Sequence, residues 1–257
     1  VSGLNGDREV LEKLVDAALA SLEANRARID DLNVYPVPDG DTGTNLTMTV
    51  RAVAEAVDNT TAASRQSLAR DVARGALMGA RGNSGVIFSQ IVRGAADVLG
   101  QEEDAAIDAA ATARALRGAT DAAYRAVRRP VEGTMLSVIR ELAEEAEARA
   151  VEHPALPALL IDLVRRGEDA LARTPEQLQI LRDAGVVDAG GAGLVELVRG
   201  VAAAVSGEPI PEITQIQESL GFEAVHQELS QYKYCTVFLI EGKGLDREQL
   251  EAELEQL

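Results

Sequence analysis

The chain of 257 residues has few of the side chains that build disulfides, metal clusters or aromatic cores. Cys235 is its single cysteine, so no intramolecular disulfide can form, and a zinc site would need ligands of other kinds. There is no tryptophan and there are three phenylalanines, so the core must be mainly aliphatic and alanine-rich. The two histidines, His153 and His226, lie outside the glycine-rich motifs described below, and we interpret both as packing or surface residues.

Positive charge is scarce as well, with 25 basic residues against 42 acidic residues and a formal net charge of −17. A field of this sign repels nucleic acid backbones and anionic membranes, so neither is expected as a primary partner. We find no signal peptide and no apolar run of about 18 residues, which predicts a cytoplasmic protein without stable membrane insertion. A phosphate ligand remains compatible with this charge if metal ions and backbone N–H groups neutralise it locally.

Apolar residues recur with helical spacing through most of the chain. This spacing, together with the residues that interrupt it, predicts helices at about 10–22, 46–57, 68–79, 84–91, 104–128, 135–142, 156–172 and 193–205. The sequence TPEQ predicts one further helix start, with Thr174 as N-cap and Gln177 closing a capping box. We interpret six residues as core, although an acyl channel would show the same spacing: Met48, Met78, Val86, Ile87, Phe88 and Ile91.

Composition changes after the last of these helices. Residues 207–230 contain two prolines and no regular period, which predicts a linker. The segment YKYCTVFLI that follows is typical of a strand, and the last thirteen residues are typical of a helix. One strand and one helix cannot form an independent domain. We therefore expect residues 1–206 to be one domain and residues 231–257 to be the start of a truncated α/β domain.

The segment NVYPVPDGDTGTN, residues 33–45, differs from the helices around it because two prolines stiffen it. Asp39 and Asp41 are separated by Gly40, and glycine permits the backbone conformation that turns both carboxylates toward one cation. Hard oxygen ligands at this spacing suit Mg²⁺ that bridges nucleotide phosphates. Residues 42–45 then begin a helix whose free N–H groups would face an anion. The alternative is a polar turn with an Asx cap.

Two further glycine-rich segments separate predicted helices, GARGNSG at 79–85 and DAGVVDAGGAGL at 183–194. In the first, Asn83 and Ser84 can donate hydrogen bonds, but the Gly-Lys-Ser/Thr pattern of a Walker loop is absent. A helix–helix turn with a C-cap glycine is the alternative interpretation. Arg81 is the one cation inside a motif loop, and it either stabilises transferred phosphate charge or is simply solvated. Three such loops in a helical bundle indicate one shared ligand at its end.

The motifs together carry a resemblance to a known family. PVPDGDTGTN, GARGNSGVIFSQ, EGTMLSVI and VVDAGGAGL, in this order over about residues 5–205, resemble the nucleotide-binding domain of fatty acid kinase. This domain belongs to the YloV-like branch of the dihydroxyacetone kinase L superfamily. The resemblance implies an all-α fold, an antiparallel barrel of about eight helices that binds ATP or ADP with Mg²⁺ at one end. The predicted strand resembles the start of that kinase's middle domain.

The resemblance also implies roles for individual residues. Asp39 and Asp41 would hold Mg²⁺, with Asn33 the nearest match to a third ligand of the superfamily. Arg81 joins the two aspartates as a catalytic candidate on its charge and position in the loop. Dihydroxyacetone kinases usually have a histidine after the second loop aspartate. This chain has Thr42 at that position, which resembles the fatty acid kinase branch. The residues implied to contact nucleotide are Thr42, Thr44, Asn45, Gly82, Asn83, Ser84, Gly85, Thr134, Met135, Leu136, Asp188, Gly190 and Gly191.

Phosphoryl transfer depends mainly on positioning and charge neutralisation. A hydroxyl acceptor usually needs a general base, often histidine, whereas a fatty acid carboxylate is ionised at pH 7 and needs none. The lack of a histidine in the motifs fits a carboxylate acceptor, and a base supplied by a partner would fit it equally.

Two functions remain open. The first is an ATP- and Mg²⁺-dependent kinase that phosphorylates a fatty acid carried by a separate fatty-acid-binding, DegV-like protein, giving an acyl phosphate. The second is an ADP-binding coenzyme or regulatory subunit of a dihydroxyacetone-kinase-like phosphotransferase. Such subunits usually end with the helical domain, so the residues after Gly207 favour the kinase. The sequence leaves open whether the chain forms a homodimer.

Overall fold

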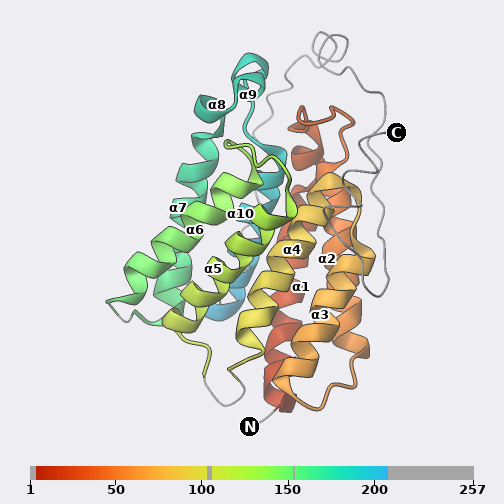
Figure 1. Cartoon of the computed structure of the whole chain (residues 1–257), viewed down its shortest axis with the longest axis vertical. Helices are drawn as coiled ribbons and strands as arrows, with labels where there is room; N and C mark the ends of the chain where they lie inside the picture. The colour runs from red at the N-terminus through yellow and green to blue at the C-terminus, as the bar shows by residue number, and fades with distance from the viewer. Residues whose placement is uncertain (1–3, 103–105, 153, 208–257) are drawn as a thin grey trace.

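The computed structural model describes residues 4–102, 106–152 and 154–207, and in these residues every regular element is a helix (Figure 1). The predicted strand, the truncated domain, the linker beyond Gly207, both histidines and Cys235 lie outside the described residues. The helices are α1 (Leu4–Asp31), α2 (Thr42–Asn59), α3 (Arg65–Gly79), α4 (Gly82–Leu99), α5 (Ala109–Ala126), α6 (Met135–Ala150), α7 (Leu156–Ala172), α8 (Thr174–Gln177), α9 (Gln179–Ala184) and α10 (Ala189–Ser206).

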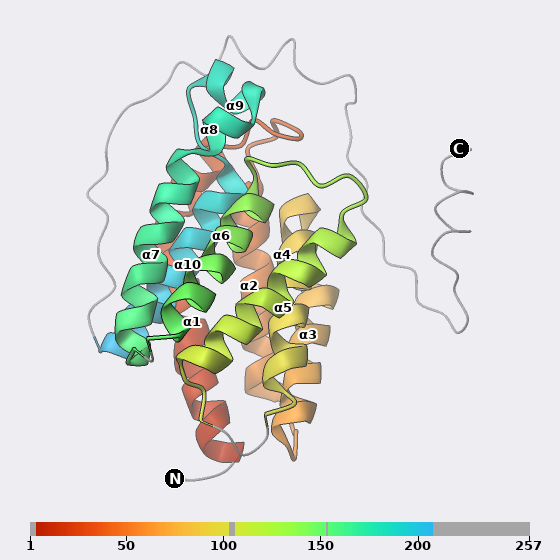
Figure 2. The same cartoon turned by 60° about the vertical axis from the view of Figure 1, so that its left-hand side comes forward.

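The eight long helices form a closed antiparallel barrel. Each helix from α1 to α7 packs against the next one along the chain, and α10 packs against both α7 and α1, which closes the ring. Figures 1 and 2 show that the short helices α8 and α9 lie beyond one end of this ring. Because the long helices alternate in direction, α2, α4, α6 and α10 all begin at that end, which we call the upper end. The predicted all-α barrel is confirmed.

Small residues allow a core with so few aromatics to pack. On α5 the buried residues are mostly alanines, and Gly118 of α5 faces Gly94 of α4. A Cβ added at Gly94 would lie 2.2 Å from the Gly118 carbonyl oxygen, so the two helices touch through their backbones. The seam between α1 and α10 is equally close, because a Cβ at Gly200 would lie 2.4 Å from the Ala17 carbonyl oxygen. Close approach of helices therefore replaces large side chains.

Most predicted helices are present, but several begin elsewhere. Helix α5 begins at Ala109 rather than at 104, because the Asp108 carboxylate accepts a hydrogen bond from the Ala111 N–H at 2.8 Å and caps it. Helix α10 begins four residues before the predicted Gly193, because Asp188 caps it in the same way.

The predicted capping box at TPEQ is wrong. Thr174 is already helical, and its hydroxyl donates to the Leu171 carbonyl oxygen at 2.7 Å and accepts from the Asp188 N–H at 3.1 Å. The hydroxyl is therefore occupied by the end of α7 and the start of α10, which lie outside the helix that it was expected to cap. Its side chain is completely buried.

Two of the predicted core residues face outward. Met48 and Met78 are 44% and 52% exposed, whereas Phe88 and Ile91 are buried as predicted. Met48 follows the buried Leu46 by two residues, which turns it about 200° around the helix axis. The inner face of α2 is already occupied by Leu46 and its successors at helical spacing, so Met48 lies on the outside of the ring.

An apolar cavity of about 410 Å³ lies inside the barrel. Its lining residues nearest the upper end include Ala18, Val50, Phe88 and Leu197, and it extends to the lower end, where Asp7, Arg65 and Gly100 border it. One helical turn above this lining, Leu22 and Leu46 are fully buried, and a Cβ at Gly193 would lie 2.4 Å from Leu46 Cδ1. This packed layer of Leu22, Leu46 and Gly193 separates the cavity from the upper end.

Helix α10 is the only helix among the described residues that is long and apolar enough to cross a membrane by composition. Its mean hydropathy is 1.3, and 61% of the segment is buried inside the barrel. Two charged residues, Glu196 and Arg199, interrupt its apolar sequence. These features are those of a core helix.

Candidate functional site

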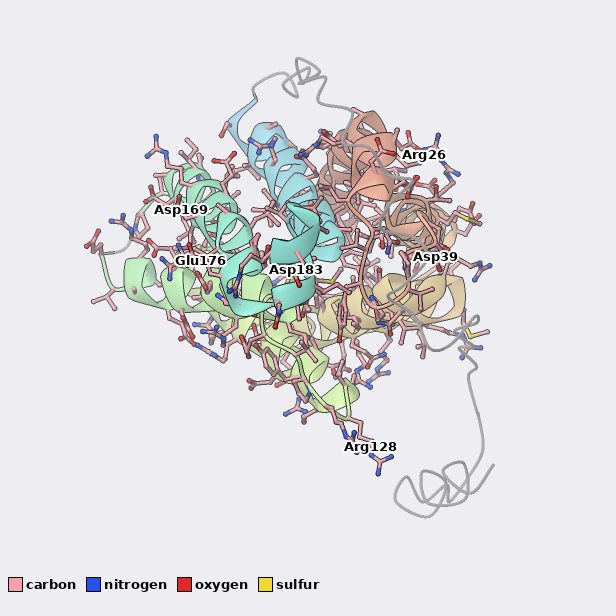
Figure 3. The ribbon with its side chains drawn as sticks, turned by 90° about the horizontal axis from the view of Figure 1, so that it is seen from above. Arg26, Asp39, Arg128, Asp169, Glu176 and Asp183 are labelled. Carbon is pink, nitrogen blue, oxygen red and sulfur yellow. The ribbon has the colours of Figure 1, made fainter. Side chains whose placement is uncertain are left out.

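The upper end of the barrel gathers four helix starts. The first-turn N–H groups of a helix have no acceptor within the helix, and they carry the positive end of its dipole. The glycine-rich segments predicted from the sequence all immediately precede or begin α2, α4 and α10, so the structure brings them to one end. Figure 3 looks onto this end, with Arg26 and Asp39 on the α1–α2 side and Asp183 near the middle.

The loop before α2 is held by a single buried amide. The Asn33 side chain is 4% exposed, and its Nδ2 donates to the Val37 carbonyl oxygen at 2.8 Å. Its Oδ1 accepts from the Asp41 N–H at 3.3 Å, the Thr42 N–H at 3.1 Å and the Thr42 hydroxyl at 2.6 Å. Asn33 thus spans the loop and caps α2. Its role as a metal ligand stays a prediction, and it would require Oδ1 to exchange these hydrogen bonds for a cation.

The carboxyl groups of Asp39 and Asp41 converge on each other. Partial burial raises the pKa of Asp39, and the charge of Asp41 and a hydrogen bond with its side chain raise it further. Two carboxylates that repel each other in this way form a suitable pair of hard oxygen ligands for a divalent cation. The described residues contain no cluster of three or more His, Cys, Asp or Glu, so Mg²⁺ here would complete its coordination with water and phosphate oxygens.

Asp30 of α1 is a site residue that the sequence reasoning missed. Its Oδ1 accepts from the Thr44 N–H and its Oδ2 accepts from the Thr44 hydroxyl, both at 2.8 Å. Asp30 therefore caps α2 from another helix, and Thr44 faces Asp30 rather than open space. A Cβ at Gly43 would lie 2.3 Å from the Arg26 carbonyl oxygen, so this glycine allows the close contact of α1 with α2. No local sequence pattern signals a cap that lies fourteen residues upstream of the residue it holds.

The first two motifs touch each other. The hydroxyl oxygens of Thr42 and Ser84 are 3.4 Å apart, which joins the start of α2 to the start of α4. Gly82 has a φ of +59°, and a Cβ there would lie 2.3 Å from Asn45 Nδ2. Asn45 therefore packs directly on the backbone of the second loop. The predicted residues Thr42, Asn45, Gly82 and Ser84 form one continuous surface.

The start of α4 differs from the other three helix starts. Asn33 and Asp30 cap α2, the Thr134 hydroxyl accepts from the Leu136 N–H at 3.3 Å on α6, and Asp188 caps α10. The N-cap of α4 is Arg81, whose side chain is directed to the Ala80 carbonyl oxygen at 2.9 Å and does not cap the helix. Among the starts of the long described helices gathered at this end, α4 alone has no side-chain cap. Its N–H groups at residues 82–84 therefore suit an anion.

Asp188 joins the starts of α6 and α10. Its side chain is buried, its Oδ2 accepts from the Gly191 N–H at 2.7 Å, and the Met135 N–H lies close enough to the carboxylate to lower its pKa. Gly190 packs on Met135, since a Cβ there would lie 3.0 Å from Met135 Cε. Burial raises the pKa of Asp188 to about 6, although the two N–H groups oppose this shift. Met135 and Leu136 are themselves buried, so these two residues can offer a ligand little beyond their backbone.

Comparison with known proteins identifies the family. Residues 36–203 match the model of the DAK2 domain. The chain therefore belongs to the DAK2 domain family. It is 38% identical over 206 residues to protein YloV of Bacillus subtilis, covering 80% of this chain and 37% of YloV. It is 37% identical over 242 residues to a protein of Staphylococcus saprophyticus, covering 91% of this chain and 44% of that protein. The chain thus spans less than half the length of these relatives.

The fold has counterparts among solved structures. The dihydroxyacetone kinase from C. freundii in complex with AMP-PNP and Mg²⁺ matches with a TM-score of 0.56 and 19% identity, over 75% of this chain and 33% of that chain. The native form of the same kinase matches with a TM-score of 0.56 and 18% identity, over 76% and 34%. At this level of identity the likeness establishes the helical fold. Both the resemblance stated from the motifs and the expected barrel are confirmed.

We predict that Asp188 makes the stability of the barrel depend on pH. Because its pKa rises from 3.8 to about 6 on folding, folding favours the protonated form. This contribution is complete below pH 3.8 and is lost as the pH rises through about 6. The free energy of unfolding of the wild type, relative to that of Asp188→Asn, should fall by about 2.5 kcal/mol from pH 4 to pH 7.5. Urea unfolding followed by circular dichroism measures this difference, and parallel curves for the two proteins would contradict it.

Proposed function

We propose that this domain binds a Mg²⁺–nucleotide at the upper end of the barrel and transfers a phosphoryl group from ATP to a fatty acid carboxylate. The acceptor would be presented by a separate fatty-acid-binding protein, and the product would be an acyl phosphate. The observation that carries the proposal is the contact between Ser84 and Thr42. It sets the uncapped start of α4, which suits phosphate, beside the Asp39–Asp41 pair, which suits a divalent cation.

Each group at this end has a role in the proposal. Asp39 and Asp41 would hold Mg²⁺, which when bound neutralises the charge that the transferred phosphoryl group spreads over its oxygens. The N–H groups of residues 82–84 and the Ser84 hydroxyl would hold the β- and γ-phosphates. Arg81 lies next to them with an exposed side chain and would stabilise the transferred charge after rotating from Ala80. The backbone at Thr134–Leu136 and at Gly190 and Gly191 would line the base.

The chemistry of the motifs supports a carboxylate acceptor. The chain has two histidines, and neither lies in any of the motifs that meet at the upper end. An alcohol acceptor would usually need such a base, whereas a fatty acid is already ionised at pH 7 and attacks without losing a proton. Positioning and charge neutralisation, which this end can supply, are then sufficient.

The position of the cavity supports delivery of the acyl chain by a carrier. The apolar cavity extends to the lower end, and the layer of Leu22, Leu46 and Gly193 separates it from the aspartates. A fatty acid whose acyl chain lay in this cavity would have to open that layer to bring its carboxylate to the phosphates. A fatty acid held by another protein instead approaches the upper end from solvent.

The fold likeness to a dihydroxyacetone kinase supports a second candidate function, that of an ADP-binding coenzyme or regulatory subunit. Such a subunit would copurify with ADP and would retain it during incubation with ATP. Mass spectrometry of the bound nucleotide, before and after exposure to ATP and Mg²⁺, distinguishes this behaviour from the exchange that a kinase requires.

We expect Asp39→Ala and Asp41→Ala each to abolish Mg²⁺-dependent nucleotide binding. Both residues lie on a loop, and removing one carboxylate relieves the repulsion that raises the pKa of Asp39, so helicity and melting temperature should hardly change. Isothermal titration with ATP, with and without Mg²⁺, measures the effect. The exposed Asp31→Ala is the matched control and should bind as the wild type does. Wild-type affinity in both loop variants would exclude the metal site.

Ser84→Ala should weaken ATP binding by about 10- to 100-fold, because it removes one hydrogen bond to a charged phosphate, worth roughly 1.5–3 kcal/mol. Ser84 does not cap α4, so the melting temperature without nucleotide should stay the same. Ser67 occupies the same position in α3 but closes a capping box with Ser64. Ser67→Ala should therefore show the reverse pattern, lower stability with unchanged ATP affinity. Calorimetry and nucleotide titration of both variants test this pattern. Equal changes in melting temperature and in ATP affinity for the two variants would refute the role of Ser84.

The carrier requirement has its own test. The chain, supplied with ATP, Mg²⁺ and a free fatty acid, should form acyl phosphate only slowly, because the apolar cavity of the described residues lies on the far side of the layer of Leu22, Leu46 and Gly193. Addition of a fatty-acid-loaded carrier protein should accelerate the reaction. Trapping with hydroxylamine as the acyl hydroxamate measures the product. Rapid formation from the free fatty acid, without any added protein, would overturn the carrier model.

A further inference from the structure

Helices α8 and α9 are not part of the ring, and the motifs assign no role to most of the segment that contains them. Residues 174–188, which we call the bracing segment, connect α7 to α10 over the upper end of the barrel (Figures 1 and 2). A direct turn from α7 into α10 would close the ring without it. The contacts of this segment show what it adds.

The bracing segment packs on the loop that carries the two aspartates. Leu181 of α9 is 1% exposed, and with Val186 and Val34 it forms a hydrophobic cluster separate from the barrel core. Tyr35 and Leu178 cover this cluster as partly buried neighbours. Val34 and Tyr35 lie between Asn33 and Asp39 in the sequence, so this apolar contact supports the loop in addition to the hydrogen bonds of Asn33.

The same segment also packs on the loop before α6. Gly133 has a φ of +81°, and a Cβ there would lie 2.8 Å from both the Leu178 Cβ and the Thr174 carbonyl oxygen. The Gly133 N–H donates to the Ser137 hydroxyl at 2.7 Å, which fixes the loop on its other side. Gly133 is followed directly by Thr134, the cap of α6. The position of this loop is thus set against α8.

A third contact joins the bracing segment to the start of α10. The buried Thr174 hydroxyl accepts from the Asp188 N–H, and the Asp188 carboxylate holds the starts of α6 and α10. At the end of α9, Gly185 adopts a left-handed conformation, and the Val186 N–H donates to the Leu181 carbonyl oxygen at 3.0 Å. This turn sends the chain back toward the barrel and places Val186 in the cluster with Leu181.

We propose that the bracing segment fixes the aspartate loop and the loop before α6 relative to each other, and that Leu181 is its principal positioning residue. The proposal rests on the Mg²⁺–nucleotide site proposed above. Leu181 lies in the only hydrophobic cluster of the described residues that includes the aspartate loop, and it touches neither carboxylate group. Truncation of Leu181 leaves a void beside Val34, so the loop gains freedom and the carboxylates are no longer held in place for the cation.

The test compares Leu181→Ala with Leu159→Ala. Leu159 is fully buried near the lower end of α7, so both variants remove the same group from an apolar site and both should lower the melting temperature. Titration of AMP-PNP at increasing Mg²⁺, below both melting temperatures, measures the Mg²⁺ needed for half-saturation. This Mg²⁺ concentration should rise roughly 10- to 100-fold in Leu181→Ala and stay unchanged in Leu159→Ala. The range is the one found when groups that orient metal ligands are removed. Leu181→Met, which keeps the volume, should restore the wild-type requirement.

Hydrogen exchange provides a readout that does not depend on nucleotide. The Asp41 and Thr42 N–H groups are protected by Asn33 in the intact loop. They should exchange faster in Leu181→Ala and not in Leu159→Ala. Equal Mg²⁺ requirements and equal exchange in the two alanine variants would overturn the proposal. Absence of Mg²⁺-dependent binding in the wild type would refute the proposed function, and the exchange result would still decide the role of Leu181. If Leu181→Ala does not fold, Leu181→Val carries the same comparison.

Discussion

The first turn of an α-helix presents N–H groups that no carbonyl of the same helix can accept, and a closed antiparallel barrel places half of these turns at one end. The present barrel brings four of them together, at α2, α4, α6 and α10. Side chains cap three of them: Asn33 and Asp30 cap α2, and the local N-cap residues Thr134 and Asp188 cap α6 and α10. The remaining start, at α4, lies beside two carboxylates that repel each other. The contact of Thr42 with Ser84 thus brings a donor site at α4 and the loop of the two carboxylates together, and the proposed Mg²⁺–nucleotide would occupy both.

The apolar cavity and the proposed nucleotide site occupy different parts of the barrel. Its lower part contains an apolar cavity, and the helices there touch through glycine and alanine. Above the layer of Leu22, Leu46 and Gly193, side chains such as Asn33, Asp30 and Asp188 hold the helix starts and the loops before them by hydrogen bonds. The rigidity of this end thus comes from hydrogen bonds between different loops, and the apolar cluster around Leu181 adds the contact that those hydrogen bonds lack.

The fold was largely predictable from the sequence, because strong helical periods bounded by glycine and proline identify helices without knowledge of their neighbours. Periodicity specifies one inner face for each helix, and the mistaken assignment of Met48 and Met78 came from counting residues outside that face as core. The motif glycines and the two loop aspartates were also recognisable, since their composition is local.

Contacts between distant segments were not predictable in this way. Asp30 capping α2, and Asp188 holding Met135, join residues that only the closed ring brings together. Thr174 was misassigned for the same reason. A threonine before proline is a good local cap. Here its hydroxyl instead forms hydrogen bonds with the end of α7 and the start of α10, and the sequence near Thr174 does not reveal these partners.

The contact of Asp188 with Met135 also has a consequence for the order of events during synthesis. Helix α10 is the last helix of the ring, and it packs against α1, the first. A nascent chain that has reached α7 already contains both loop aspartates and the start of α4, but α6 still lacks its link to Asp188 and the ring is open. Because domains fold as units once their chain is available, ligand binding would be acquired in one late step, when the first and last helices meet. An incomplete chain would then lack the nucleotide site proposed for this end.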